Sequence, residues 1–383
     1  MTGPAYRLSD YGRMIADEGR TGAYAESLKR LVTPRSVVVD IGTGTGIFAL
    51  LAARLGARKV YAIEPSDVIE FGRLIAAHNG LDERVEFIQG LSTDVQLPEP
   101  ADIIVFDIHG ILPANERSLS AIMDARDRFL APGGALIPRR ETMWASLVEA
   151  AALHHENVGV LAGEVFGIDM TAMSSSVANI WHKGRARPAE LVTTPACWAV
   201  LDYAILRSPN VRGEAAWEIR DRRAAHGICV WFDWEGAEGA TFSNSPLSGE
   251  RHLFGQAFFP WPEPLDLCPG DDVRIQLRSD AVGPSYIYTW ETVVRGKDGA
   301  TKAAFQQSDF LGAPLSSERL RKLASAPTLS EDGRIDQLIL NSVASGLMLE
   351  QIAREVSAGF PHRFATWTDA QPRVTQVSIR YSK

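Results

Sequence analysis

Two carboxylates lie nine positions apart in the stretch FDIHGILPANERS (106–118), which begins where an apolar run ends. Asp107 follows that run directly, and Glu116 comes after Gly110 and Pro113, which interrupt regular structure. Two acids on such a loop could hold a cation through charge-assisted hydrogen bonds, and one of them could accept a proton. The structural alternative is that Asp107 is an acid at a strand end that caps a neighbouring helix or faces solvent.

A glycine-rich turn supplies a second group of candidate residues. The stretch VVVDIGTGTG carries three glycines between a β-branched run and a helical pattern: Gly42, Gly44 and Gly46. Glycines at this point let backbone N–H groups approach a ligand, and the N-terminus of the following helix favours negative charge. Glu64 closes the next apolar run, where a carboxylate can accept both hydroxyls of a ribose. The pattern therefore predicts a nucleoside-containing cofactor.

The acid ahead of the turn decides between two cofactors. Nicotinamide-dependent dehydrogenases use a related turn to hold pyrophosphate. Asp40 would repel a pyrophosphate but would suit an ammonium group. S-adenosylmethionine has an ammonium group and a ribose but no phosphate, so the sequence favours it, with S-adenosylhomocysteine as the product.

The surrounding sequence indicates the elements that position these groups. Residues 10–33 keep apolar residues at helical spacing, which predicts two short helices ending before Pro34. From 36 to about 145, apolar runs alternate with helical patterns, which is typical of βαβ units and a parallel sheet. From 146 to about 312, short β-type runs separated by turn residues indicate an antiparallel barrel or sandwich. Residues 313–383 return to a helical pattern.

Composition narrows the function classes. The chain has 383 residues, of which 45% are hydrophobic and 22% charged, as in ordinary globular proteins. The net charge of −8 disfavours a general nucleic-acid binder, whereas a local acidic patch could still meet a cationic substrate. No signal-peptide pattern or long apolar run occurs, which predicts a cytoplasmic protein without a membrane partner. The three widely spaced cysteines predict reduced thiols and no metal site.

Five stretches, in order along the chain, resemble the protein arginine methyltransferases over about residues 10–312. They are MIADEGRT, VVVDIGTGTGIFALLAARLGARKVYAIEPS, ARDRFLAPGGALIP, EVFGIDMTAM and PAELVTTPACWAVLDY. The resemblance implies an α/β fold in which a Rossmann-like class I methyltransferase domain precedes an antiparallel β-barrel-like domain, and it implies a homodimer. The expected division is N-terminal helices over 1–35, the Rossmann-like domain over 36–145, the barrel-like domain over 146–312 with a dimerisation arm at about 173–195, and a small helical module over 313–383.

The resemblance also assigns cofactor contacts. It implies that Arg20 holds the cofactor carboxylate and that Glu64, followed by Pro65, holds the ribose. Ser92 and Thr93 fall where the family has a valine and a glutamate against the adenine. A hydroxyl binds the adenine amine less strongly than a carboxylate does, so we expect weaker cofactor affinity.

For the acceptor side, the resemblance places Asp107 and Glu116 where two glutamates of the family grip the substrate guanidinium, with Glu116 as the expected base. His252, in GERHLFGQAFF, falls where a family histidine pairs with an N-terminal acid. The family also has longer or flatter side chains at several of these positions. Here the departures are Asp107 for a glutamate, Ile108 and His109 for an aromatic residue and a methionine, and Arg251 and Leu253 for a threonine and a tryptophan.

The expected activity is S-adenosylmethionine-dependent N-methylation of a guanidino group in an arginine-containing protein, peptide or small molecule. Two alternatives stay open: transfer to a non-guanidino acceptor, which Asp107 and the lost tryptophan favour, and a catalytically silent binding or assembly module. The C-terminal stretch LMLEQIAREVSAGFP loosely resembles winged-helix-like modules of the PqqD type, which hold leader peptides. Its alternative is a small helical domain that packs on the barrel or stabilises the dimer.

Overall fold

The computed structural model describes residues 7–161, 163–237, 239–249, 252–312, 326 and 328–381. The chain divides into two compact units, Met1–Pro314 and Leu315–Lys383. None of the helices in the described part is long and apolar enough to cross a membrane.

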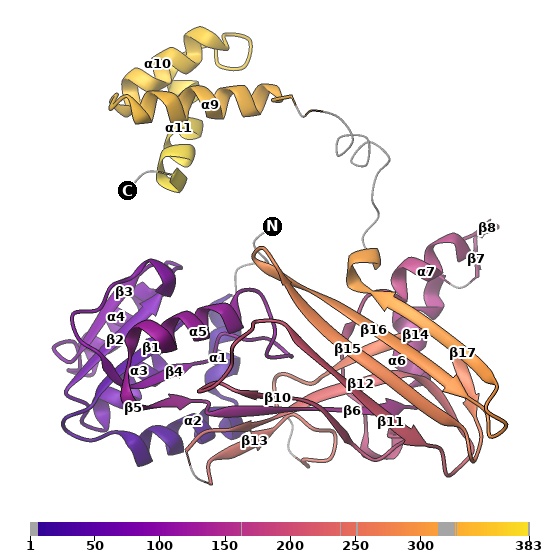
Figure 1. Cartoon of the computed structure of the whole chain (residues 1–383). Helices are drawn as coiled ribbons and strands as arrows, with labels where there is room; N and C mark the ends of the chain where they lie inside the picture. Colours follow the sequence, from indigo (N-terminus) through magenta and orange to yellow (C-terminus); the bar gives the residue numbers. More distant parts are fainter. Residues whose placement is uncertain are drawn as a thin grey trace. The chain divides into compact units, whose positions relative to one another are not determined.

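The first unit begins with two helices and a five-stranded parallel sheet in the order β3-β2-β1-β4-β5 (Figure 1). The strands are β1 (Val37–Ile41), β2 (Lys59–Glu64), β3 (Val85–Gln89), β4 (Ala101–Phe106) and β5 (Leu130–Ile137). The helices are α1 (Leu8–Ile15), α2 (Glu18–Leu31), α3 (Ile47–Arg54), α4 (Ile69–His78) and α5 (Ser118–Phe129), with the short η1 (Ser92–Asp94). All of β1 is buried, because helices cover both faces of the sheet.

The strand order reverses between β1 and β4, so the chain leaves these two neighbours toward opposite sides of the sheet. In open α/β sheets, ligands bind at the carboxyl ends of the strands at such a switch point. The glycine turn follows β1, and the two predicted acids follow β4. The topology therefore brings both groups of candidate residues to one edge of the sheet.

Two antiparallel sheets form the rest of the first unit. One has the order β10-β6-β12-β14-β9, with β13 paired to β12, and the other has the order β11-β15-β16-β17. Their strands are β6 (Arg140–Val148), β9 (His182–Gly184), β10 (Ala196–Asp202), β11 (Val211–Glu218), β12 (Arg223–Glu235), β13 (Thr241–Ser243), β14 (Gln256–Leu267), β15 (Asp272–Val282), β16 (Ser285–Arg295) and β17 (Thr301–Ser308). A final turn, η5 (Asp309–Gly312), ends the described part of the unit. The expected antiparallel domain is confirmed, but β6 already starts at Arg140, a few residues before the predicted boundary.

The core is continuous from the parallel sheet into the antiparallel sheets. Tyr24 of α2 stacks on Phe48 of α3 at 4.3 Å and contacts Trp234 of β12 at 4.6 Å. An apolar helix face therefore joins the two halves. Among the largest fully buried side chains are four tryptophans of the antiparallel strands: Trp231, Trp234, Trp261 and Trp290.

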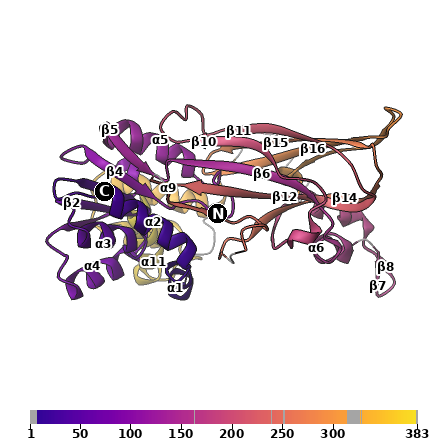
Figure 2. The ribbon, with the colours of Figure 1, turned by 90° about the horizontal axis from the view of Figure 1, so that it is seen from below.

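A segment between β6 and β10 leaves the sheets. It contains α6 (Ala151–Asn157), η2 (Gly159–Leu161), β7 (Glu164–Val165), β8 (Ile168–Asp169), η3 (Thr171–Met173), α7 (Ser174–Val177) and η4 (Pro188–Glu190). Figures 1 and 2 both show α6, β7 and β8 at the end of the antiparallel sheets that lies away from the parallel sheet. The predicted arm at 173–195 overlaps this segment, but the β7–β8 hairpin lies before it and β9 belongs to the large sheet.

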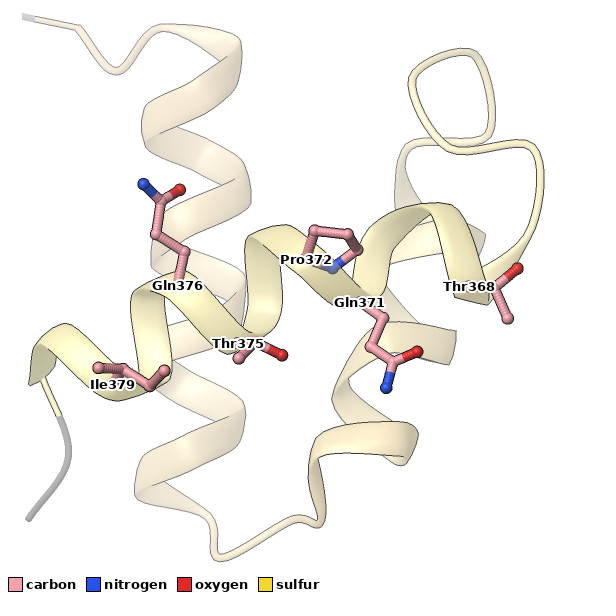
Figure 3. A pocket seen from close by; sticks show the side chains of 6 residues that line it. All are labelled: Thr368, Gln371, Pro372, Thr375, Gln376 and Ile379. Atoms are coloured by element: carbon pink, nitrogen blue, oxygen red, sulfur yellow. The ribbon is translucent and has the colours of Figure 1, made fainter.

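The second unit contains α9 (Glu331–Ala344), α10 (Leu349–Gly359) and α11 (Trp367–Tyr381) around its own apolar core. Helices α9, α10 and α11 agree with the helical pattern expected over 313–383, whereas residues 313–325 of that range lie outside the described residues. Residues 328–381 include no strand, so they show no wing of a winged helix. Six side chains of α11 line a shallow pocket (Figure 3): Thr368, Gln371, Pro372, Thr375, Gln376 and Ile379.

Candidate active site

The turn after β1 requires glycine. Gly42, Gly44 and Gly46 have φ angles of 68°, 55° and 89°, a region that other L-residues rarely adopt. A Cβ on Gly42 would lie 2.2 Å from Cγ2 of Ile108, and one on Gly44 would lie 2.8 Å from Cε1 of Tyr11. The turn is therefore packed between α1 and the loop that follows β4.

Asp40 stabilises the glycine turn through two hydrogen bonds. Its Oδ2 accepts hydrogen bonds from Oγ1 of Thr43 at 2.6 Å and from the backbone N–H of Ala49 at 3.0 Å. Burial raises the pKa of Asp40 to about 7, although these two hydrogen bonds lower it. Asp40 thus fixes the turn against α3, and its predicted contact with an ammonium group stays a prediction.

Glu64 joins the ends of β2 and β1. Its Oε2 accepts from the N–H of Gly44 at 3.1 Å, while Oε1 accepts from the N–H and Oγ of Ser66 at 3.0 and 2.6 Å. The side chain is buried, and the neighbouring Pro65 is exposed. The structure therefore brings Glu64 to the glycine turn, as a ribose-binding acid would require.

Ser92 and Thr93 follow β3 at the same edge of the sheet. The backbone there is tied to Glu64, since the N–H of Gly90 donates to the Glu64 carbonyl at 3.1 Å. Ser92 is buried, and its carbonyl accepts from Nη2 of Arg128 at 2.6 Å, whereas Thr93 is exposed. Their predicted contact with adenine stays a prediction.

Arg20 and Asp107 form a buried ion pair between Nη2 and Oδ2, with side chains 6% and 9% exposed. Nη1 of Arg20 donates to the Met14 carbonyl at 2.8 Å, and the guanidinium lies 5.5 Å from the ring centre of Phe48. On the other side, Tyr24 Oη lies 3.4 Å from Oδ1 of Asp107. Burial lowers the pKa of Arg20. The residue expected to hold the cofactor and the first residue expected to hold the acceptor therefore bind each other.

Glu116 lies in a different environment from Asp107. Its side chain is exposed, none of the described residues donates a hydrogen bond to it, and its φ of 47° lies in the left-handed region. Such a backbone costs on the order of 1–3 kcal/mol and is concentrated at functional sites. Tyr288 of β16 anchors this part of the loop by donating to the Ala114 carbonyl at 2.7 Å. The structure thus presents Glu116 to solvent on a loop tied to both halves of the unit.

His252 pairs with an N-terminal acid, as the sequence resemblance implied. Its Nδ1 lies 3.1 Å from Oδ1 of Asp17, whose Oδ2 accepts from the N–H of Leu253 at 2.7 Å. Asp17 also caps α2 by accepting from the N–H of Arg20 at 3.2 Å. Burial would raise the pKa of Asp17, but the hydrogen bonds from His252, Leu253 and Arg20 lower it to about 2. The contact between His252 and Asp17 joins α2 to the segment before β14. A catalytic role for His252 stays a prediction. Arg251 lies outside the described residues.

Sequence reasoning missed the residues that surround His109. Nε2 of His109 lies 3.0 Å from Oε1 of Glu141, which starts β6, and the hydroxyl of Tyr203 donates to the other carboxylate oxygen. The rings of Phe254 and Phe232 contact the imidazole with centroids 5.6 and 5.2 Å away. No pattern within either segment marks a pair 32 positions apart, because the residues meet only when the loop after β4 packs against the start of β6.

Comparisons with known proteins identify similar sequences. The model of the family described as "Ribosomal protein L11 methyltransferase (PrmA)" matches residues 20–137. "Protein arginine N-methyltransferase 1" of Schizosaccharomyces pombe is 30% identical over 274 residues, covering 68% of this chain and 78% of that protein. "Probable histone-arginine methyltransferase CARM1" of Oryza sativa subsp. indica is 32% identical over 324 residues and 77% of this chain, and the chain spans 59% of its length.

Two solved structures share the fold. The "Trypanosoma brucei PRMT1 enzyme-prozyme heterotetrameric complex with AdoHcy" has a TM-score of 0.72 at 23% identity and covers 79% of this chain and 98% of its own. "Protein Arginine Methyltransferase 10" of Arabidopsis thaliana has a TM-score of 0.69 at 22% identity, with coverages of 79% and 97%. The expected fold, a Rossmann-like domain followed by an antiparallel domain, is therefore confirmed.

Proposed function

This chain belongs to the protein arginine N-methyltransferase family, and we propose that it transfers a methyl group from S-adenosylmethionine to a guanidino nitrogen of an arginine. The observation that carries the proposal is the buried Arg20–Asp107 pair beside the glycine turn. It sets a cation suited to a carboxylate next to an anion suited to a guanidinium, at the switch point of the sheet. Incubation with labelled cofactor and arginine peptides, followed by mass spectrometry for methylarginine, tests the proposal.

The cofactor side of the site rests on groups that fit S-adenosylmethionine. Arg20 would bind the cofactor carboxylate, and its Nε is a buried donor without a partner among the described residues. Glu64 would accept from the ribose hydroxyls, and the backbone of the glycine turn, whose positive φ angles glycine adopts readily, would lie against the cofactor. Asp40 would face the ammonium group, with Pro65, Ser92 and Thr93 toward the adenine. The bound cofactor supplies a methyl group that is already activated for transfer, so the protein mainly has to position the acceptor.

The acceptor side rests on the loop between β4 and α5, which we call the acid loop (107–117). A guanidinium and a sulfonium repel each other unless anions offset their charges. Asp107 would orient the guanidinium by charge-assisted hydrogen bonds, and the exposed Glu116 would complete the binding and accept the proton released on transfer. When Arg20 shares its donors with a second carboxylate, Asp107 is freed to take the acceptor.

One observation favours a second candidate, transfer to a non-guanidino acceptor. Asp107 is already neutralised by Arg20, and Leu253 stands where the family has a tryptophan, which would stack on a guanidinium. A site with one free carboxylate holds a cation less firmly than a site with two. Adding non-arginine amines, hydroxyl compounds and carboxylic acids to the labelling reaction separates the two candidates.

We infer that the protein acts as a homodimer, on arginine-containing protein, peptide or small-molecule substrates, and that it is cytoplasmic. The β7–β8 hairpin exposes an apolar tip, in which Phe166 is 102%, Ile168 64% and Val165 41% exposed. At the opposite end of the unit, α4 exposes Phe71 and Leu74 at 42% and 66%. Two copies related by a twofold axis could cover both surfaces at once, because the hairpin of each copy would lie on α4 of the other.

We expect Phe166→Asp to weaken dimerisation by at least about tenfold, because it removes a fully exposed aromatic ring from the proposed contact. Aspartate tolerates the left-handed backbone at this position, where φ is 51°. Sedimentation equilibrium over a range of protein concentrations measures the effect. Ile205→Asp, at a 70% exposed position outside both surfaces, is the matched control. Equal association of Phe166→Asp and the wild type would remove the hairpin from the interface.

A further inference from the structure

Two ionisable residues beside the acid loop have no part in the proposed function. His109 lies on the loop itself, and Glu141 begins β6; their side chains are 1% and 0% exposed. Isolated charges at such depth are costly, so buried ionisable groups occur in pairs or carry a function. The two residues also mark a departure of this chain, since His109 stands where the family has an apolar side chain.

Both nitrogens of the His109 ring face an oxygen atom. Nδ1 lies 3.0 Å from the Gly110 carbonyl, and Nε2 lies 3.0 Å from a carboxylate oxygen of Glu141. The Gly110 carbonyl can only accept, an ionised Glu141 can also only accept, and a neutral imidazole carries a single N–H. Burial alone would lower the pKa of His109, but Glu141 and the Gly110 carbonyl raise it above its ordinary value. These contacts favour an imidazolium beside a carboxylate, and Tyr203 donates to the second oxygen of Glu141.

The His109 ring also faces Asp107, the carboxylate expected to bind the acceptor. Nε2 of His109 lies 4.0 Å from Oδ1 of Asp107, whose Oδ2 binds Arg20. Asp107 thus has one cation at each oxygen, and Arg20, Asp107, His109 and Glu141 alternate in charge. The groups that face His109 from the surrounding elements are Arg20 and Tyr24 of α2, Asp107 of the acid loop, Glu141 of β6, Tyr203, Phe232 of β12 and Phe254.

We propose that His109, held by Glu141, is a positioning residue that orients the Asp107 carboxylate toward the acceptor. The proposal rests on the proposed function, in which Asp107 binds the guanidinium. Aspartate is one methylene shorter than the glutamate of the family, so its carboxylate depends more on what holds it from behind. If His109 loses its proton, Asp107 and Glu141 become two anions around a neutral ring, and the attraction that fixes Oδ1 disappears.

The proposal predicts a specific pH dependence. A histidine whose pKa is raised in the folded protein keeps its proton until the pH rises through that folded value. Turnover should therefore fall on the alkaline side as His109 deprotonates. Glu141→Gln removes the carboxylate that raises the pKa of His109 while the burial that lowers it remains, so the alkaline limb should move to lower pH.

The experiment measures kcat/KM for an arginine peptide from pH 6 to 9.5 with the full chain and four variants: Glu141→Gln, His109→Gln, the double variant and His155→Gln. We expect His109→Gln to lower kcat/KM at pH 8 by at least about tenfold and to remove the limb, with the cofactor Kd from calorimetry within about threefold of wild type. His155→Gln, an exposed histidine of α6, is the matched control and should behave as wild type.

A second readout needs no activity. Nitrogen NMR of the histidine rings in the full chain, assigned from the Glu141→Gln and His109→Gln spectra, should show His109 doubly protonated at pH 7. A singly protonated ring would overturn the proposal even if the variants fold poorly. Unchanged kcat/KM and pH profile in folded His109→Gln would overturn it while leaving the proposed function intact. If the wild type methylates no arginine substrate, the proposed function falls and this proposal falls with it.

Discussion

Glu116→Gln is expected to lower kcat by about 10²- to 10⁴-fold, the range that a general base supplies. The residue is exposed, unpaired among the described residues and held in a left-handed backbone on the acid loop, so its carboxylate is available to an incoming cation. Glutamine keeps the size and one acceptor oxygen of the group but can neither offset a positive charge nor accept the proton. Steady-state kinetics with an arginine peptide measures the loss.

The cofactor should be unaffected by this substitution. Glu116 contacts none of the residues assigned to S-adenosylmethionine, so the cofactor Kd should stay within about threefold of wild type. Glu214→Gln changes an exposed glutamate of β11 far from the acid loop and should leave kcat unchanged. A Glu116→Gln enzyme that turns over at the wild-type rate would remove Glu116 from the mechanism.

Asp107→Asn should destabilise the first unit by about 3–5 kcal/mol, because it leaves the Arg20 guanidinium buried without its anion. It should also abolish most turnover, since the acceptor loses one of its two carboxylates. Denaturant unfolding followed by tryptophan fluorescence measures the first effect, because four fully buried tryptophans report on this unit. The cofactor product provides a sharper readout: its carboxylate can replace the lost partner of Arg20, so S-adenosylhomocysteine should stabilise Asp107→Asn more than it stabilises the wild type.

A double variant is the matched control for this prediction. Arg20→Met with Asp107→Asn should recover much of the lost stability, since it leaves no buried charge without its partner. It should gain little from S-adenosylhomocysteine, because the cation that holds the carboxylate is gone. Two results would contradict a controlling role of the Arg20–Asp107 pair in stability and cofactor binding. In the first, Asp107→Asn is as stable as the wild type; in the second, S-adenosylhomocysteine stabilises it no more than it stabilises the wild type.

The domain with the parallel sheet could be predicted from the sequence for a physical reason. Strands buried on both faces appear as continuous apolar runs, as in Val37–Val39, and the turn after β1 needs glycine at positions with positive φ. The same local logic located Glu64 and both acids of the acid loop. The antiparallel strands begin at Arg140, a few residues before the boundary expected after residue 145, although Pro138 and Arg139 mark the break between β5 and β6 in the sequence.

Contacts between side chains of distant segments could not be predicted from the sequence in this way. Arg20 and Asp107 were each assigned to a different ligand, yet they bind each other because α2 docks beside the end of β4. Nothing in the sequence marks Glu141, and its pairing with His109 depends on the packing of the start of β6 against the acid loop. The pairing of His252 with an N-terminal acid was expected only through the family resemblance, since 235 positions separate it from Asp17.

The most direct test of the account is to find the atom that receives the methyl group. The full chain is incubated with methyl-labelled S-adenosylmethionine and three acceptors: an arginine peptide, the same peptide with lysine in place of arginine, and free arginine. The products are hydrolysed and separated by mass spectrometry, with Glu116→Gln run in parallel. The account predicts label on guanidino nitrogens of arginine, none on the lysine peptide and a strong loss in Glu116→Gln. Label found only on non-guanidino atoms, or on no acceptor while the cofactor binds, would contradict it.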